Sequence, residues 1–432
     1  MKKYMIIVAL LISSTTVLAQ KKDLMDNMPC NGNADNMPGK YTDHTHPKYP
    51  FSLKGTAQEK AYMTSQLIAI EKTEEASRKN FQLTGCVARV SFSSLLSNNS
   101  NFNHTGYGYQ LGVYRTVCHA TQHIVKTVDE YRTVLRVDVN PTLVVGSIPA
   151  TQIGIGDFNI GKSQQSVRYQ IPTDAVQGPG YSQDCINKPS RVSKYISERM
   201  VLTGRSDNYK DAHTDFLKLN NGNGYVENWL GGDRYGNHNA SSYQWVDRHY
   251  LITQPGIPLL IPVSRKQYLQ DMLEYLEIEK TNFYYDVDRR IKEYAGNNAD
   301  YAKQKMEVLL ADKAAYPELY ETKKIKIKQL LVSQKADWLQ QQAIVGNSKN
   351  TYDANDRLKE LGTFYDREEE YRSALYVINP EYFKRNTSQP AKPILIEVQF
   401  RYELTRDYDF SERLFNNFLK NFDFNALRKI VQ

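Results

Sequence analysis

The run IPLLIPVSRKQYLQDMLEYLEIEKTNFYYDVDRRIKEYAG, residues 257–296, changes its hydrophobic period part-way along and thereby indicates the fold class. It starts as an almost entirely apolar stretch, which is typical of a short strand that ends in a turn. Ser264 then begins a capping box with Gln267, in which both side chains satisfy backbone N–H groups at a helix start. From Leu269 onward apolar residues recur at helical spacing, so a long amphipathic helix should follow and end at Gly296.

Two more helices are expected after this one. The first spans about 299–314. The second begins at Pro317, which suits the first turn of a helix, and runs to about Val345 before Gly346 stops it. Together the helices predict an antiparallel helical hairpin over about 264–345, with one buried face and one wet face.

The charged residues of this region are interpreted as solvent-exposed helix faces. Asp286 and Asp288 form a carboxylate pair on one helix. The densest basic cluster alternates in part with isoleucine: Lys323, Lys324, Lys326 and Lys328. Such runs on helices are usually solvated rather than built to bind an anionic surface. A glycosidase pair drawn from distant strands would leave no local spacing, so a hydrolase with dispersed carboxylates stays open as an alternative.

Ahead of the helices the hydrophobic period changes to two. Tyr107, Tyr109, Leu111 and Val113 alternate with other residues, and shorter strand-like runs continue to about residue 172. Alternation of this kind is typical of half-buried antiparallel strands. Several such strands separated by turn residues predict a β-rich N-terminal part built as a sandwich or a curved antiparallel sheet.

A late strand shapes the expected topology. Residues 394–400 have strand character although they follow the helices. The helical hairpin should therefore be inserted between strands of one sheet, in a protein of the α+β class. We expect a loop-like N-terminal arm over 20–55, a β-rich domain over 56–190 and an α+β domain over 191–432.

The amino terminus has the pattern of a secretory signal peptide. Residues 1–3 (MKK) provide the basic region, residues 4–12 are apolar, and residues 17–19 (VLA) end in a small-x-small cleavage site. We expect residues 1–19 to be removed after Ala19. The mature protein should then be exported to the periplasm or the cell exterior.

Export would place four cysteines in an oxidising compartment, where disulfides persist. They are Cys30, Cys86, Cys118 and Cys185. Four cysteines allow three connectivities, and the sequence does not choose among them. One or two structural disulfides are expected, with free thiols as the alternative. The sequence has no CxxC spacing of the kind that indicates redox or zinc chemistry.

Composition narrows the range of partners. The formal charge of +7 lies mostly in the first 250 residues without dense clustering, which is too weak a signal for nucleic-acid binding. The apolar runs are too short for a membrane-spanning helix. Tyrosine is unusually common, with 31 Tyr against 15 Phe and 3 Trp. Most of these rings are expected to pack in the protein with the hydroxyl as a polar handle.

Signatures of common chemistries are missing. His119 and His123 are four residues apart but lie among strand-like residues, so they are interpreted as surface or loop histidines. His44 and His46 lie in the arm, where they could bind metal only adventitiously. No Gly-x-Ser-x-Gly elbow, dinucleotide-binding glycine pattern or EF-hand loop occurs. We therefore expect no metal, no cofactor and no catalytic residue, which favours a non-enzymatic protein.

One local pattern suggests recognition, and it lies in a glycine-rich loop within 225–250. Aromatic rings can stack on the C–H faces of sugars while amides and charges bind the hydroxyls, so the loop suits sugar-like ligands. The candidate ligand-binding residues are Trp229, Asp233, Arg234, Tyr235, Asn237 and Trp245. The alternative is a long loop pinned by two core aromatic residues.

Two further runs have a recognisable pattern. PLLIPVSRKQYL, residues 258–269, matches proline, two apolar residues and x-Pro-Val-Ser/Thr-Arg-Lys-x-Tyr-Leu, and INPEYF, residues 378–383, matches Asn-Pro-x-Tyr-Phe/Trp before a strand. Both resemble segments of a family of large exported Bacteroidetes-type proteins for which no activity is known. The likeness covers mainly residues 245–432 and implies export and chain organisation rather than a function.

These observations predict an exported binding or interaction protein of the bacterial envelope, whose partner is a glycan or an envelope protein. An envelope hydrolase that acts on glycans through dispersed carboxylates is one alternative. A structural subunit that presents the helical hairpin to a protein partner is the other.

Overall fold

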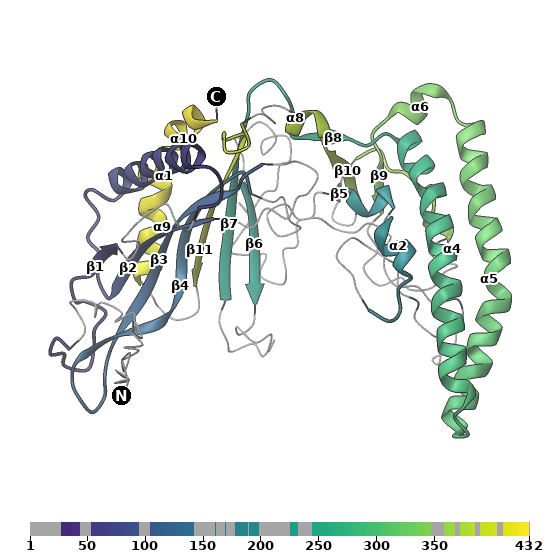
Figure 1. Cartoon of the computed structure of the whole chain (residues 1–432), viewed down its shortest axis with the longest axis horizontal. Helices are drawn as coiled ribbons and strands as arrows, with labels where there is room; N and C mark the ends of the chain where they lie inside the picture. The colour runs from purple at the N-terminus through teal and green to yellow at the C-terminus, as the bar shows by residue number, and fades with distance from the viewer. Residues whose placement is uncertain are drawn as a thin grey trace, which may run out of the picture.

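The computed structural model shows a main sheet with its own helices and, beside it, a long helical hairpin (Figure 1). The described residues are 27–43, 53–94, 104–141, 160, 169, 178–188, 190–197, 225–231, 244–346, 358–367, 372–384, 389–403 and 409–431. Strands dominate the N-terminal half of this part of the chain and helices dominate the rest. The α+β class predicted from the sequence is confirmed.

Seven strands form the main sheet in the order β1-β2-β3-β4-β11-β7-β6. They are β1 (Lys40–Asp43), β2 (Cys86–Ser94), β3 (Tyr107–Cys118), β4 (Val125–Val139), β6 (Tyr225–Gly231), β7 (Gln244–Thr253) and β11 (Leu395–Glu403). Neighbours are antiparallel except β1 and β2, which are parallel. Because β11 lies between β4 and β7, the chain leaves the sheet after β7, forms the hairpin and returns. The predicted insertion is therefore confirmed.

Three helices pack on one face of the main sheet. They are α1 (Ala57–Ser77), α9 (Asp409–Asn421) and α10 (Phe424–Ile430). A capping box of Thr56 and Glu59 starts α1. Leu67 of α1 and Phe418 of α9 join strand residues such as Phe400 in one hydrophobic core. Among the described residues, helices rather than a second sheet cover this face. The sheet is mainly antiparallel, as predicted, with the parallel pair β1 and β2 as the exception.

The main sheet draws its strands from both sides of residue 190. β2, β3 and β4 come from the segment expected as a β-rich domain, and β6, β7 and β11 come from the expected α+β domain. The join is a long one, since Val134–Val139 of β4 pair with Ile396–Arg401 of β11. One sheet therefore spans the two expected domains.

A second sheet connects the main sheet to the hairpin. Its strands are β5 (Ile196–Ser197), β8 (Leu260–Pro262) and β9 (Ile344–Gly346), all paired with β10 (Arg372–Ile378). The short helix α8 (Pro380–Lys384) follows β10. The Asn379 side chain donates to the Pro258 carbonyl at 2.8 Å, and the Tyr382 hydroxyl donates to the Ile394 carbonyl and accepts from the Gln254 N–H. Residues 378–383, the second sequence motif, thus connect the end of β7 and the start of β11 to the segment that leads into the insertion.

The hairpin consists of α4 (Arg265–Ala295) and α5 (Asp300–Ser333), followed by the short α6 (Ala336–Gln340). The Ser264 hydroxyl accepts a hydrogen bond from the Gln267 N–H at 3.1 Å, which is the N-cap half of the predicted capping box. The Gln267 side chain instead bonds to Asp271. The short helix α2 (Gln183–Asn187) packs on α4. Among the described helices, none is long and apolar enough to cross a membrane.

The expected break between 299–314 and Pro317 is wrong, because α5 continues through Pro317. The expected helix end near Val345 is also wrong, because α5 ends at Ser333 and Ile344–Gly346 form β9. Proline cannot donate to the carbonyl four residues back, here that of Lys313, and usually bends or ends a helix. Leu309 and Tyr316 before the proline and Tyr320 after it are all buried in the same core against α4. This continuous packing on both sides of the proline overrides its local preference.

Replacing Pro317 with alanine should stabilise the protein. The exposed proline removes one helical hydrogen bond, and alanine restores it. After allowance for the greater entropy of the unfolded alanine chain, we expect a gain of about 1–2 kcal/mol. Urea unfolding of the variant would measure this gain, with the exposed Glu318→Ala as a matched control that stays close to the wild-type value. A loss of stability in Pro317→Ala would contradict this account of α5.

The described part of the N-terminal arm is mostly turns and bends before β1, as expected, and it is held against the sheet. A disulfide joins Cys30 to Cys118 at the end of β3. The Asn27 N–H donates to the Val125 carbonyl at 2.9 Å, and β1 adds a strand beside β2. The other two cysteines, Cys86 and Cys185, are buried free thiols. Burial raises the pKa of Cys86 to about 12, so its thiol stays protonated and unreactive at neutral pH.

Candidate functional site

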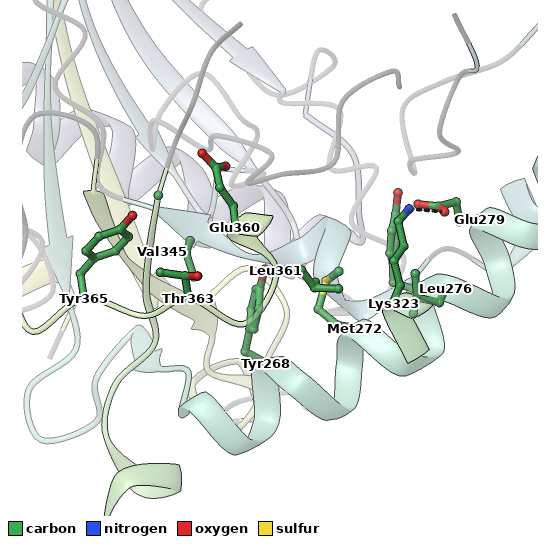
Figure 2. A pocket seen from close by; sticks show the side chains of 12 residues that line it. Tyr268, Met272, Leu276, Glu279, Lys323, Val345, Glu360, Leu361, Thr363 and Tyr365 are labelled. Carbon is green, nitrogen blue, oxygen red and sulfur yellow. Dashed lines mark hydrogen bonds and ion pairs between the residues drawn. The ribbon is translucent and has the colours of Figure 1, made fainter. Parts of the chain in front are cut away.

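A small pocket lies between α4, α5 and the chain that follows β9 (Figure 2). Its volume is about 70 Å³. The lining residues are Tyr268, Met272, Tyr275, Leu276, Glu279, Lys323, Val345, Gly346, Glu360, Leu361, Thr363 and Tyr365. The lining is therefore mostly apolar and aromatic, with a few polar groups, which is the usual make-up of a ligand site.

One stripe of α4 supplies a wall of the pocket. Tyr268, Met272, Tyr275 and Glu279 follow one another at spacings of three or four, so they share a helix face. Of these four, only Met272 belongs to the apolar stripe that the sequence predicted from Leu269 onward, so the pocket wall lies beside that stripe. The opposite wall comes from residues 358–367, a segment that the sequence analysis did not single out.

Gly362 adopts the left-handed backbone conformation, which brings residues 358–367 close to the hairpin. Gly362 has a φ of 75°, and a Cβ at this position would lie 2.2 Å from Leu330 of α5. Lys326 of α5 donates to the carbonyls of Leu358 and Lys359 at 2.7 and 3.1 Å. The sequence analysis made no prediction for this segment, and Gly362 is the one local signal that could have indicated a turn there.

A buried ion pair closes one end of the pocket. Lys323 Nζ lies 2.8 Å from Glu279 Oε1, and the Tyr316 hydroxyl donates to the same oxygen at 3.0 Å. The ion pair lies at one end of the drawn side chains in Figure 2, with Thr363 and Tyr365 at the other. The interpretation of Lys323 as part of a solvated face is wrong, because it shares the buried stripe of Tyr316 and Ile327.

Arg265 holds the outer wall of the pocket in place. Its guanidinium carbon lies 4.8 Å from the ring centroid of Trp338 and 5.5 Å from that of Phe364. It also donates to the Tyr365 carbonyl at 3.2 Å and pairs with Asp366 at 3.3 Å. Three residues of the first sequence motif, residues 258–269, therefore shape the pocket. Ser264 caps α4, Arg265 positions the wall formed by residues 358–367, and Tyr268 lines the pocket.

Tyrosine–carboxylate hydrogen bonds recur through the core and account for part of the tyrosine excess. The pairs are Tyr109–Glu74 (2.8 Å), Tyr169–Asp312 (2.8 Å), Tyr195–Asp271 (2.5 Å) and Tyr316–Glu279 (3.0 Å). Burial raises the pKa of Asp271 and Asp312, while the tyrosine hydroxyls act in the other direction. The hydroxyl is thus the polar handle that the sequence predicted, and it is used within the protein.

The carboxylate pair on α4 divides into two environments. Asp288 is half exposed and pairs with Lys313 at 2.5 Å, which fits a helix face in contact with water. Asp286 is completely buried, so its interpretation as a solvated residue is wrong. Arg289 and Arg290 lie 2.6 and 2.9 Å from its oxygens and compensate the buried charge.

A second charged cluster lies on the main sheet and joins β7 to β11. His249 Nδ1 lies 2.6 Å from Glu397, and its Nε2 lies 3.3 Å from Asp247. Arg401 pairs with the other oxygen of Asp247 at 2.5 Å. Asp247, His249 and Glu397 are all buried. Asp138 of the neighbouring β4 is close enough to sense the charges of His249 and Glu397.

Mutual attraction sets the charges of this cluster. Burial alone would lower the pKa of His249, but Asp247 and Glu397 raise it to about 9. Burial likewise opposes the ionisation of Asp247, yet His249 and Arg401 lower its pKa to about 2. Burial raises the pKa of Asp138 to about 6. His249 is therefore an imidazolium at neutral pH.

This cluster is poorly suited to acid–base catalysis. A general base needs a ring nitrogen that is unprotonated and within reach of a substrate proton. Both nitrogens of His249 face carboxylates, and its raised pKa keeps it protonated. Within the described ranges, no group of three or more His, Cys, Asp or Glu residues is arranged to hold a metal ion. We therefore interpret the cluster as a structural ion network.

The glycan-binding prediction falls largely outside the described residues. Asp233, Arg234, Tyr235 and Asn237 are not described, and neither are the side chains of Trp229 and Trp245. Pairing of β6 with β7 places the two tryptophans on adjacent strands, with Trp229 opposite Val246 and Leu230 opposite Trp245. The proposed sugar site stays a prediction.

The histidines singled out in the sequence do not share a helix face. His119 and His123 lie in the turn between β3 and β4, and the Gln122 N–H donates to His119 Nδ1 at 3.3 Å. His123 has a φ of 50°, which fits a tight turn. His44 and His46 lie outside the described residues.

Comparisons with known proteins do not identify a relative. No family model matches the chain, no curated protein is similar to it in sequence, and no solved structure is similar to it in fold. The pocket is therefore interpreted from its own chemistry. The resemblance of the two motifs to exported proteins stays an expectation.

Proposed function

We propose that this is an exported, non-enzymatic binding or interaction protein of the bacterial envelope, and that the pocket on α4 receives a small group of its partner. The disulfide between Cys30 and Cys118 supports export, because such bonds persist mainly in oxidising compartments. The arrangement of His249 between two carboxylates favours a structural role over a catalytic one. The observation that carries the proposal is the pocket itself.

The size of the pocket limits what can enter it. Sites for whole small-molecule ligands usually enclose about 300–1,000 Å³. The pocket here encloses about 70 Å³. An engineered cavity of about 150 Å³ is enough to bind benzene. A group of a few heavy atoms, such as a branched aliphatic end, fits this volume, whereas a whole sugar ring would have to lie mostly outside it.

The position of the pocket also favours a large partner that inserts only one small group into it. The pocket lies on the hairpin close to its attachment, since Tyr268 is in the first turn of α4. A partner that inserted one group here could extend along the exposed faces of α4 and α5. Capture of a terminal group of a larger molecule therefore agrees with the size and the place of the pocket.

Methyl NMR of the mature chain would test whether the pocket binds. We expect 2-methylpropan-1-ol, a neutral probe of the right size, to shift the methyl resonance of Met272 in a saturable way. Leu361→Trp should abolish the shift by filling the pocket, and Thr363→Trp would fill it from the mouth if the first variant failed to fold. The exposed Leu419→Ala on α9, which packs on the main sheet, is the control and should bind like the wild type. An unshifted Met272, or a shift that survives in a folded filled variant, would refute the proposal.

A further inference from the structure

We infer that the group received by the pocket is amphipathic and cationic, with a short aliphatic chain inside and an ammonium at the mouth. This inference rests on the proposed function and names the class of ligand for the same site. It follows from the different positions of the three charged residues that line the pocket, Glu279, Lys323 and Glu360.

The inner charges are already committed to each other. Lys323 and Glu279 are both almost fully buried and lie 2.8 Å apart. An anionic ligand that used Lys323 would have to displace Glu279, which would leave a buried carboxylate with only Tyr316 as its partner. The ion pair therefore presents little net charge to a ligand, and it disfavours anions at the inner end.

The charge at the mouth is available. Glu360 is exposed, lines the pocket and has no ion-pair partner among the described residues. It lies close enough to Tyr268 to act on that ring: burial first, and then the Glu360 charge, raise the pKa of Tyr268 to about 12. Tyr268 thus stays neutral, and the carboxylate is the unbalanced charge of the pocket. In Figure 2 Glu360 projects above Tyr268 and Leu361.

Two arginines near the outer wall have other partners. Arg265 stacks near Trp338 and pairs with Asp366, as described above. Arg372 lies over the ring of Tyr365, with its guanidinium carbon 4.1 Å from the ring centroid. The face of the Tyr365 ring is therefore already occupied by the Arg372 guanidinium. We place the ammonium group of the ligand beside Glu360 instead. The apolar part of the ligand would contact Met272, Leu276 and Leu361.

Three probes of similar shape separate this inference from its alternatives. They are 2-methylpropan-1-amine, which is a cation, 2-methylpropan-1-ol, which is neutral, and 3-methylbutanoate, which is an anion. Each probe is titrated into the mature chain at low salt, and binding is followed by the chemical shift of the Met272 methyl group. The amine should bind most tightly and the anion most weakly. The affinities should differ by about two- to fivefold between the amine and the alcohol, and again between the alcohol and the anion, because Glu360 is exposed and its ion pairs are weak.

Glu360→Gln should bring the three affinities together, and added salt should reduce the preference in the wild type. Glu307→Gln, an exposed acid elsewhere on α5, should leave the order unchanged. Binding of the anion as tightly as the amine, or an unchanged order in Glu360→Gln, would overturn the inference. Binding of the alcohol without any preference for the amine would refute this inference alone, whereas failure of all three probes would refute the proposed function as well.

Discussion

Replacing His249 with leucine should lower the free energy of unfolding by about 3–5 kcal/mol, because it would leave Asp247 and Glu397 without their shared cation in a buried site. Asp247 would keep Arg401, so most of the loss should arise at Glu397. Urea unfolding followed by circular dichroism would measure the change. His119→Leu, in the exposed turn after β3, is the matched control and should stay within about 0.5 kcal/mol of the wild type.

The cost should come from the stranded carboxylates rather than from the loss of the ring. Replacing Asp247, His249 and Glu397 together with leucine removes the whole buried network, and such replacements are often neutral or stabilising. The triple variant should therefore be more stable than His249→Leu alone. A single variant as stable as the wild type would contradict the network, and a triple variant that is worse than the single one would contradict the mechanism.

The same cluster predicts how stability depends on pH. His249 has a pKa of about 9 in the folded protein against about 6.5 when unfolded. Its contribution is therefore fully present below about pH 6.5 and is lost as the pH rises to about 9, an effect on the order of 3 kcal/mol. Asp138, with a pKa of about 6, acts in the same direction at lower pH. Asp247, with a pKa of about 2, loses its contribution only as the pH falls below its unfolded value of 3.8.

Unfolding measured between pH 6 and pH 9 would test this dependence. The difference between the wild type and His249→Leu isolates the charged cluster around the histidine, because groups away from it titrate alike in both proteins. That difference should shrink as the pH rises. A difference that is constant across this range would show that the pKa of His249 is not raised by folding.

Local signals in the sequence were enough to place the main elements. The cap at Ser264 and the apolar spacing from Leu269 identify α4, and the strand at 394–400 identifies the insertion, because each signal is a property of a few neighbouring residues. The predicted helix break at Pro317 was wrong because it, too, relied on a local signal. Its local effect is to break a helix, but packing against α4 decides the outcome, and that packing joins residues far apart in the chain.

Only the wall of the pocket that α4 supplies could be predicted from the sequence. Tyr268 and Met272 belong to a stripe whose burial follows from helical spacing, and the motif that contains Arg265 and Tyr268 drew attention to this segment. Glu360 and Tyr365 reach the site through the turn at Gly362, and nothing local indicates which helix that turn contacts. Lys323 shows the limit most clearly, since a lysine is buried only when a partner such as Glu279 is delivered by another helix.

Removing the disulfide is the other change with a large expected effect. The bond spans 88 residues of sequence, and release of that constraint on the unfolded chain would cost about 4–5 kcal/mol in the chain-entropy account. Cys30→Ser/Cys118→Ser should therefore lower the urea midpoint strongly. Cys185→Ser, which removes a buried free thiol, is the control and should cost much less. Titration of thiols after unfolding without reductant should find two per wild-type chain, and four would contradict the pairing.

The structure also says where the loss should appear first. Cys30 fastens the arm to the end of β3, and the same arm carries β1, which pairs with β2 at the edge of the main sheet. Without the bond, hydrogen exchange should accelerate first in Lys40–Asp43 and around Val125. Detachment of β1 would expose the edge of β2, and exposed edges promote pairing between chains. The double serine variant should therefore aggregate at concentrations where the wild type stays dispersed, whereas uniform acceleration across the whole sheet would show that the bond acts only through the unfolded chain.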